Sequence, residues 1–210
     1  MLKQDGKLKD IQTSLGKFLL LIPLSPNQWT LLSLLVAIGA GFVIAIHHDL
    51  GLGLFLFAIA ALMDAIDGAV ARARNEASDL GGFLDGVIDR FVEAIFLFSL
   101  MFYPLPLFLI DPKIWLAGVL FFGTAMPSFI RAYADHKAII SHEKALELGG
   151  ICERAERMAI LVLSLITGII YSMDFFVYGL VLVVILSLIT IVQRLNSIIL
   201  LSSLGGKQKR

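Results

Sequence analysis

The sequence has a single cysteine and few charged residues. Cys152 has no second cysteine to pair with, which excludes an internal disulfide and leaves a small buried or interfacial residue as the expected role. Charged residues make up 16% of the 210 residues, and the net charge is zero, so nothing suggests a nucleic-acid partner. Soluble domains carry ~25% charged residues. The scarcity of charge therefore argues against an ordinary soluble domain.

Long apolar segments take the place of the missing charge. Hydrophobic residues make up 58% of the chain, and the mean hydropathy is +0.88. A helix that crosses the bilayer needs ~20 mostly apolar residues. Six segments approach that length, which predicts an all-α integral membrane protein with six transmembrane helices. They are residues 27–46, 51–73, 82–103, 113–135, 155–172 and 175–200.

The segment before the first span has a different pattern. Residues 1–24 contain four lysines, and their apolar residues recur at helical spacing, which predicts an amphipathic helix on the membrane surface. Pro23 and Pro26 end this helix, and no small-residue cleavage pattern follows, so a signal peptide is not expected. The expected organisation is this helix, a transmembrane domain over residues 25–204 and a short basic tail over residues 205–210.

Lysine and arginine positions predict the orientation. If six spans alternate in direction, every lysine and arginine except Lys113 falls on the same side. Positive charge collects on the cytoplasmic side of membrane proteins. Both termini are therefore expected in the cytoplasm, in a multi-pass protein of the cell membrane.

Four aspartates occur where the second span ends and the third begins. Asp64 and Asp67 are three residues apart, and Asp85 and Asp89 are four apart, so each pair shares one face of its helix. The short connection at residues 72–80 makes the two helices antiparallel neighbours. All four carboxylates are therefore expected at similar depth, facing the cytoplasm.

Clustered carboxylates at this depth need compensation. Each costs ~2.5–3.5 kcal/mol at the centre of a spanning helix and less near the interface. Two Mg²⁺ or Mn²⁺ ions would balance four negative charges, because hard cations prefer oxygen ligands and paired metals serve displacement at phosphorus. The alternative is that the acids pair with Arg72, Arg74 and Arg90, while Gly82 and Gly86 permit close helix packing.

The spacing of these residues resembles the signature of the CDP-alcohol phosphotransferase family, D-x2-D-G-x2-A-R-x8-G-x3-D-x3-D. The stretch SPNQWT at residues 25–30 also looks like the family's segment before its first span. Together with the six spans, the resemblance covers nearly the whole chain. The matching residues are Asp64, Asp67, Gly68, Ala71, Arg72, Gly81, Asp85 and Asp89.

The resemblance implies a metal-dependent enzyme that transfers a substituted phosphate from a CDP-alcohol, expected to be a CDP-lipid, to a hydroxyl acceptor and releases CMP. Asp89 would be the catalytic general base, and a homodimer is implied. The expected metal ligands are Asp64, Asp67, Asp85 and Asp89. The expected nucleotide-binding residues are Asp64, Gly68, Ala71, Arg72 and Gly81.

A second polar cluster bears on the acceptor. The strings PSFIRAYAD and GGICERAERM look like the subgroup that accepts inositol 1-phosphate, and several guanidiniums suit a phosphate dianion. Tyr133 departs from that subgroup, which often has a basic residue there. The residues expected to bind the acceptor phosphate are Ser128, Arg131, Arg154, Arg157 and Arg194.

Three alternatives remain open. An enzyme that joins CDP-inositol to inositol phosphate would use the same acceptor pocket, and glycerol 3-phosphate is another possible acceptor. A transporter is the non-enzymatic alternative. Transporters usually place their site near the middle of the membrane between repeated halves. The aspartates here lie toward one side, and the sequence shows no repeat, which favours the enzyme.

Overall fold

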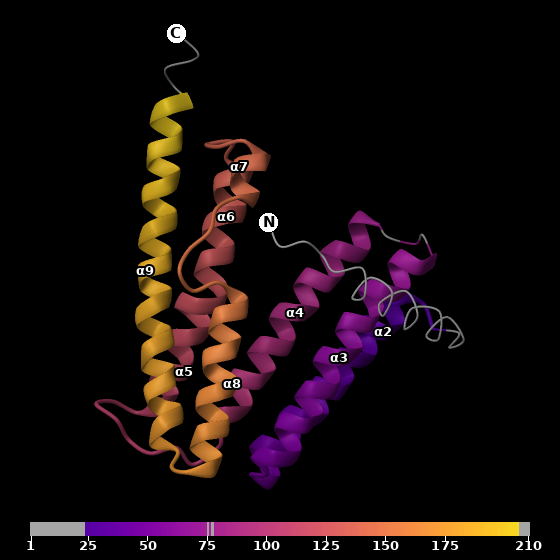
Figure 1. Cartoon of the computed structure of the whole chain (residues 1–210), viewed down its shortest axis with the longest axis vertical. Helices are drawn as coiled ribbons and strands as arrows, with labels where there is room; N and C mark the ends of the chain where they lie inside the picture. The colour runs from indigo at the N-terminus through magenta and orange to yellow at the C-terminus, as the bar shows by residue number, and fades with distance from the viewer. Residues whose placement is uncertain (1–23, 75, 77, 206–210) are drawn as a thin grey trace, which may run out of the picture. The chain divides into compact units, whose positions relative to one another are not determined.

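The computed structural model describes residues 24–74, 76 and 78–205. These residues form helices and connecting segments, without any strand among them (Figure 1). The all-α prediction is therefore confirmed. The amphipathic helix predicted over residues 1–24 lies outside the described residues except for Leu24, as does the basic tail except for Gly205.

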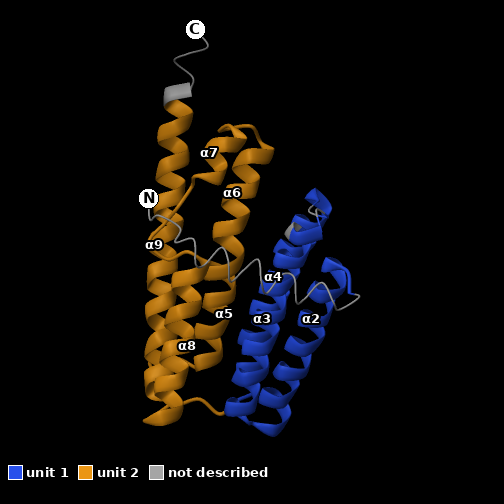
Figure 2. Cartoon of the chain, turned by 45° about the vertical axis from the view of Figure 1, so that its right-hand side comes forward, with its two compact units in different colours: residues 1–103 blue, residues 104–210 orange. Residues whose placement is uncertain are grey.

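The chain divides into two compact units, residues 1–103 and 104–210 (Figure 2). Each unit contains three of the six predicted spans. In unit 1 the helices are α2 (Pro26–Phe42), which continues as the π-helix η1 (Val43–His47), α3 (Leu50–Arg74) and α4 (Asp79–Leu100).

Local side-chain caps explain where the helices of unit 1 begin. Ser25 Oγ accepts the N–H of Gln28, and Gln28 Oε1 accepts the N–H of Ser25, which together form a capping box before α2. Asp49 Oδ1 accepts the N–H of Leu52 at the start of α3. Ser78 Oγ accepts the N–H of Gly81 at the start of α4. Each cap satisfies a backbone donor that has no partner within its helix.

Helix α2 packs against both α3 and α4. A Cβ on Gly41 would lie 2.7 Å from Ile95 Cγ2, so a glycine is needed where α2 crosses α4. The Phe57 and Phe96 rings meet edge to face at 5.1 Å, which joins α3 to α4. These contacts set the packing of α3 and α4, the two helices that carry the aspartates.

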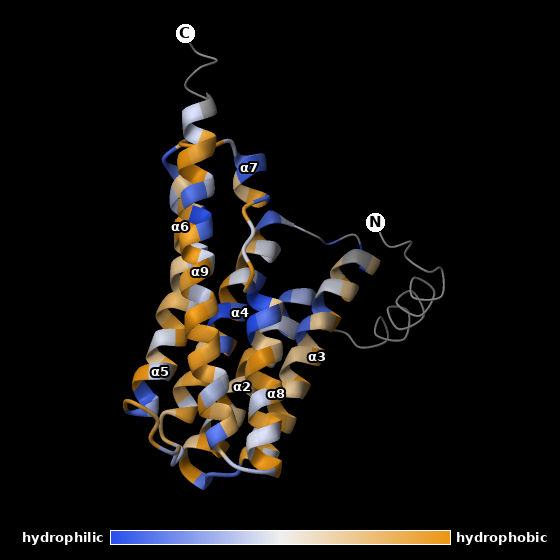
Figure 3. Cartoon of the chain, turned by 60° about the vertical axis from the view of Figure 1, so that its left-hand side comes forward, coloured by the Kyte–Doolittle hydropathy of each residue, from blue (hydrophilic) through white to orange (hydrophobic). Residues whose placement is uncertain are grey.

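Unit 2 begins with one long helical segment that changes geometry twice. Helix α5 (Pro112–Gly118) continues into the π-helix η2 (Val119–Ala125) and then α6 (Met126–His136). A short α7 (His142–Leu146), α8 (Arg154–Ile170) and α9 (Asp174–Gly205) follow. Hydrophobic residues run along most of α9, whereas hydrophilic residues gather at α7 (Figure 3). The three spans predicted in this unit coincide with α5 to α6, α8 and α9, whereas α7 lies in a stretch expected to be a polar connection.

Among the residues that the structure describes, four helical segments are long and apolar enough to cross a membrane: Pro26–His47, Leu50–Ala71, Pro112–His136 and Asp174–Ser203. They coincide with four of the six predicted spans. Helix α4 has 22 residues but carries the charged Asp85, Asp89 and Arg90 within its length. Helix α8 has 17 residues, fewer than the ~20 that a span usually requires. A six-span arrangement therefore remains a prediction.

Candidate functional site

Three of the four predicted carboxylates converge in unit 1. Asp64 and Asp67 of α3 and Asp85 of α4 each place a carboxylate oxygen within 4.8 Å of the others. Asp67 is 6% exposed, and the other two are half-buried. Three hard oxygen donors at this spacing fit a small divalent cation. The arrangement confirms that the two helices bring their acidic faces together.

Thr30 of α2 supports this cluster. Its hydroxyl donates a hydrogen bond to Asp67 Oδ2 at 2.5 Å, and both groups are buried. The bond occupies one oxygen of Asp67 and orients the carboxylate. The sequence marked the SPNQWT stretch only through its resemblance, and spacing alone gave no sign that Thr30 reaches Asp67.

Asp89 lies one helical turn beyond Asp85 on α4 and is half-buried. It is not part of the three-carboxylate group. It nevertheless shares one face of α4 with Asp85, because the two residues are four apart. Asp89 is therefore close to the cluster but distinct from it, a position that suits a different chemical role.

A cleft of about 200 Å³ opens beside the carboxylates. The small residues predicted to bind the nucleotide, Gly68, Ala71 and Gly81, line this cleft, and so do Asp67 and Asp85. Small side chains let a ligand approach the helix backbones closely. The side chain of Arg72 is outside the described part of the chain. The sequence did not assign the other lining residues to nucleotide binding; they are Pro26, Asn27, Thr30, Glu76, Ser78 and Gly82.

Gly81 provides a steric test of this cleft. A Cβ at Gly81 would lie 3.2 Å from Ser78 Oγ and 3.8 Å from Asn27 Oδ1, so a larger side chain would enter the space between them. Gly81→Leu is expected to raise the KM for the CDP-donor about tenfold, since overpacking costs ~1–3 kcal/mol. Gly86→Leu is the matched control on the same helix, because nothing lies within 4 Å of a Cβ there. Equal effects of both changes on KM would contradict the placement of the nucleotide in this cleft.

The predicted acceptor residues all belong to unit 2, and the structure separates them into two groups. Ser128, Arg131 and Arg154 are half-buried. Arg157 and Arg194 are only 3% and 2% exposed. The half-buried side chains are accessible to a ligand, whereas the two buried guanidiniums bond to backbone carbonyls.

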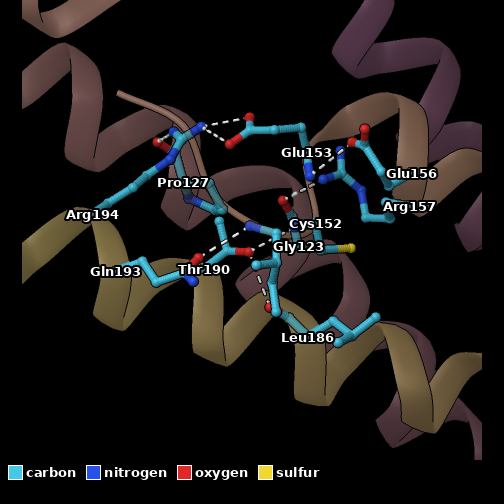
Figure 4. Close-up of polar contacts among 11 residues, drawn as sticks. Gly123, Pro127, Cys152, Glu153, Glu156, Arg157, Leu186, Thr190, Gln193 and Arg194 are labelled. Carbon is cyan, nitrogen blue, oxygen red and sulfur yellow. Dashed lines mark hydrogen bonds and ion pairs between the residues drawn. The ribbon is translucent and has the colours of Figure 1, made fainter. Parts of the chain in front are cut away.

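Arg157 donates a hydrogen bond to the carbonyl of Gly123, which Pro127 leaves without its usual helical donor. Pro127 has no N–H, so the carbonyl of Gly123, four residues earlier, lacks its α-helical donor. Arg157 Nη1 donates to Gly123 O at 2.8 Å (Figure 4). A Cβ on Gly123 would lie 2.8 Å from Arg157 Cδ, so glycine leaves the room for this approach. The guanidinium thus joins the start of α8 to η2.

Arg194 joins three elements. From α9, its Nη1 donates to the carbonyl of Pro127 in α6. Its Nη2 lies 2.7 and 2.6 Å from the two carboxylate oxygens of Glu153, which immediately precedes α8 (Figure 4). Sequence reasoning singled out Arg194 but missed Glu153, because the residues are 41 positions apart and no periodicity relates them.

Tyr133 stands on α6, where a basic residue was expected from the resemblance. Its ring stacks on Phe129 with centroids 5.2 Å apart, and Lys137 Nζ lies 5.4 Å from the Tyr133 ring centroid. A positive charge is therefore present one turn beyond Tyr133. The sequence pattern connected Lys137 only with the positive charge that predicts the membrane orientation.

Cys152 is buried, as expected from the sequence, and is a free thiol. Burial raises its pKa, and the nearby charge of Arg157 only partly offsets this effect. A thiol with a raised pKa is a weak nucleophile at neutral pH. Cys152 therefore has a packing role rather than a reactive one.

Comparison with known proteins agrees with this geometry. An archaetidylinositol phosphate synthase from Pyrococcus horikoshii is 31% identical over 188 residues, 90% of each chain. Another from Methanothermobacter thermautotrophicus is 32% identical over 83% of each chain. A phosphatidylinositol phosphate synthase from Mycobacterium tuberculosis, crystallised with manganese and citrate, has the same fold, with a TM-score of 0.74 and 24% identity over 89% of this chain and 88% of that one.

The sequence as a whole matches one family. Residues 23–192 match the sequence profile of the CDP-alcohol phosphatidyltransferases, a range that includes the carboxylate cluster, the cleft and most of the basic residues of unit 2. The expectation drawn from the spacing of the aspartates is therefore confirmed. This chain belongs to the CDP-alcohol phosphatidyltransferase family and is a CDP-alcohol phosphotransferase.

Proposed function

We propose that this enzyme transfers the lipid phosphate of a CDP-lipid to inositol 1-phosphate and releases CMP. The observation that carries the reaction class is the convergence of Asp64, Asp67 and Asp85 beside a cleft lined by small residues. The acceptor is supported by the basic residues of unit 2 and by the archaetidylinositol phosphate synthases that match over nearly their whole length.

In this proposal Asp64, Asp67, Asp85 and Asp89 hold two divalent cations, the first three residues as the cluster that converges in unit 1. A bound Mg²⁺ or Mn²⁺ supplies positive charge that stabilises the anionic pyrophosphate during displacement. Thr30 keeps the carboxylate of Asp67 oriented. Gly68, Ala71, Arg72 and Gly81 are the proposed nucleotide-binding residues together with Asp64, and the small ones leave space for the donor to reach the helix backbones.

Asp89 is the proposed general base. It accepts the proton of the acceptor hydroxyl as that oxygen forms a bond to the phosphorus bearing the lipid. The bond from this phosphorus to the oxygen of CMP breaks, and CMP leaves with the electron pair. Asp89 suits this role because it lies beside the three-carboxylate cluster without belonging to it.

The basic residues of unit 2 are proposed to bind the acceptor phosphate in two ways. Ser128, Arg131 and Arg154 contact it directly, since their side chains are half-buried. Arg157 and Arg194 contribute positive charge nearby and hold the helices that carry the other three. Arginine suits this role because its planar fork matches phosphate oxygens.

The enzyme is proposed to span the membrane six times as a homodimer, with its site facing the cytoplasm. The 22 residues of α4 are long enough to cross at ~1.5 Å per residue, and three of its five charged residues, Asp79, Asp85 and Asp89, lie in the half that carries the metal cluster. The arrangement of lysine and arginine supports cytoplasmic termini.

Synthesis of a soluble inositol phosphate diester from CDP-inositol is the second candidate. Bifunctional IPC transferase and DIPP synthases from Aquifex aeolicus and Thermococcus kodakarensis match this chain at 31% and 33% identity. The matches cover only 33% and 24% of those longer proteins. The near-complete coverage of the lipid-forming relatives favours a lipid donor.

A matrix of donors and acceptors tests the proposal. Purified protein with Mg²⁺ or Mn²⁺ is expected to release CMP fastest from a CDP-lipid with inositol 1-phosphate, more slowly with glycerol 3-phosphate and most slowly with serine. A clear preference for either of the last two would overturn the acceptor assignment. A preference for CDP-inositol over CDP-lipids would instead support the soluble product.

A further inference from the structure

We propose that Glu153 is a positioning residue for the acceptor-phosphate site, acting through Arg194. The inference rests on the proposed function, because it concerns the site that binds inositol 1-phosphate. Spacing and residue type assigned no role to Glu153, whereas its neighbours Arg154 and Arg157 were expected to bind the acceptor phosphate. The structure gives that charge a specific partner.

Glu153 and Arg194 form a closely bonded pair. Both carboxylate oxygens accept from Arg194 Nη2, at 2.7 and 2.6 Å, while Arg194 Nη1 donates to the carbonyl of Pro127 (Figure 4). The Arg194 side chain is 3% exposed, and that of Glu153 is 38% exposed. A buried guanidinium needs a compensating charge, and Glu153 supplies it from the protein itself.

The segment just before α8, residues 150–153, is bonded to α9 at successive positions. The N–H of Ile151 donates to Gln193 Oε1 at 3.0 Å, and the N–H of Cys152 donates to Thr190 Oγ1 at 3.0 Å. A Cβ on Gly150 would lie 2.3 Å from Thr190 Cγ2, so a glycine is required at this approach. The Glu153–Arg194 ion pair is the last of these contacts before α8 begins.

This pair controls where the phosphate-binding residues lie. Arg154 directly follows Glu153, so the pair fixes the first residue of α8. Ser128 directly follows Pro127, so the bond from Arg194 to the Pro127 carbonyl fixes the corresponding turn of α6. One guanidinium therefore sets the spacing between two elements that each provide a residue for the acceptor phosphate.

The effect of removing the charge follows from this arrangement. Glu153→Gln keeps the length and one accepting oxygen but leaves the charge of Arg194 uncompensated, so the guanidinium and both tethered turns shift. Small misplacements in a binding site change its efficiency by up to about 100-fold. Glu153→Asp keeps the charge on a shorter side chain and is expected to have a smaller effect.

The test measures the KM for inositol 1-phosphate and for the CDP-lipid separately. Glu153→Gln is expected to raise the acceptor KM about tenfold or more, with a donor KM within about twofold of the wild type. Glu147→Gln, an exposed glutamate at the end of α7, is the matched control and should change neither KM. An unchanged donor KM shows that the variant is folded and that the effect is local to the acceptor.

A double-mutant cycle separates positioning from direct binding. If Glu153 acts through Arg194, Glu153→Gln added to Arg194→Gln should raise the acceptor KM no further than Arg194→Gln alone. An acceptor KM that stays unchanged or falls in Glu153→Gln, equal rises in both KM values, or fully additive effects would each overturn the inference. The wild-type enzyme with inositol 1-phosphate tests the proposed function in parallel, so failure of that reaction is recognised separately.

Discussion

Replacing Asp85 with asparagine is expected to raise the Mn²⁺ concentration needed for half-maximal CMP release by about 100-fold or more. Partners that only orient a metal ligand are already worth about 10- to 100-fold in metal affinity, and Asp85 is the one carboxylate that α4 contributes to the three-residue cluster. Removing its charge leaves two carboxylates from a single helix, which cannot enclose the ion from both sides.

Binding of Mn²⁺, followed by electron paramagnetic resonance of the purified protein, provides a measurement independent of turnover. Asp79→Asn is the control, because Asp79 lies on the same helix and is exposed in its first turn. Normal Mn²⁺ binding by Asp85→Asn would show that the cluster is not the metal site. Chelation of the metal from the wild type should abolish CMP release, and added Mn²⁺ should restore it.

The carboxylate cluster was predictable because it depends on helical geometry alone. Asp64 and Asp67 share a face through their spacing, and the short connection to α4 brings Asp85 to the same level. The part played by Thr30 was not predictable, because it depends on how α2 is rotated against α3. No sequence spacing reports that rotation, although the contact from Thr30 to Asp67 spans only 37 positions.

The helices were largely predictable from hydropathy, with one physical limitation. Hydropathy located α4 and α8, but neither is typical of a span. Helix α4 carries too many charged residues, and α8 is short, with 17 residues. Hydropathy did not predict the π-helix η2. The carbonyl of Gly123 in η2 accepts a hydrogen bond from Arg157 of α8, 34 positions later, and no local pattern reports that contact.

The arginines show what residue type alone does not reveal. Arg157 and Arg194 have the charge of phosphate ligands, yet each is buried with a bond to a backbone carbonyl. Sequence reasoning treats all arginines in a cluster alike because it contains no information on burial. The distinction between contacting a phosphate and holding the contacting residues requires the fold.

Asp89→Asn is expected to reduce kcat by about 100- to 10,000-fold, the usual contribution of a general base. Because Asp89 is outside the three-carboxylate group, this variant should keep the Mn²⁺ bound by that group and its donor KM, in contrast to Asp85→Asn. Stopped-flow or single-turnover CMP release at saturating donor and metal measures the loss, with Asp79→Asn as control. Complete loss of Mn²⁺ binding together with turnover would show that Asp89 acts through the metal rather than as the base, and near-normal turnover would remove it from catalysis. The pair of variants thus divides one acidic motif into residues that hold the ion and a residue that moves the proton.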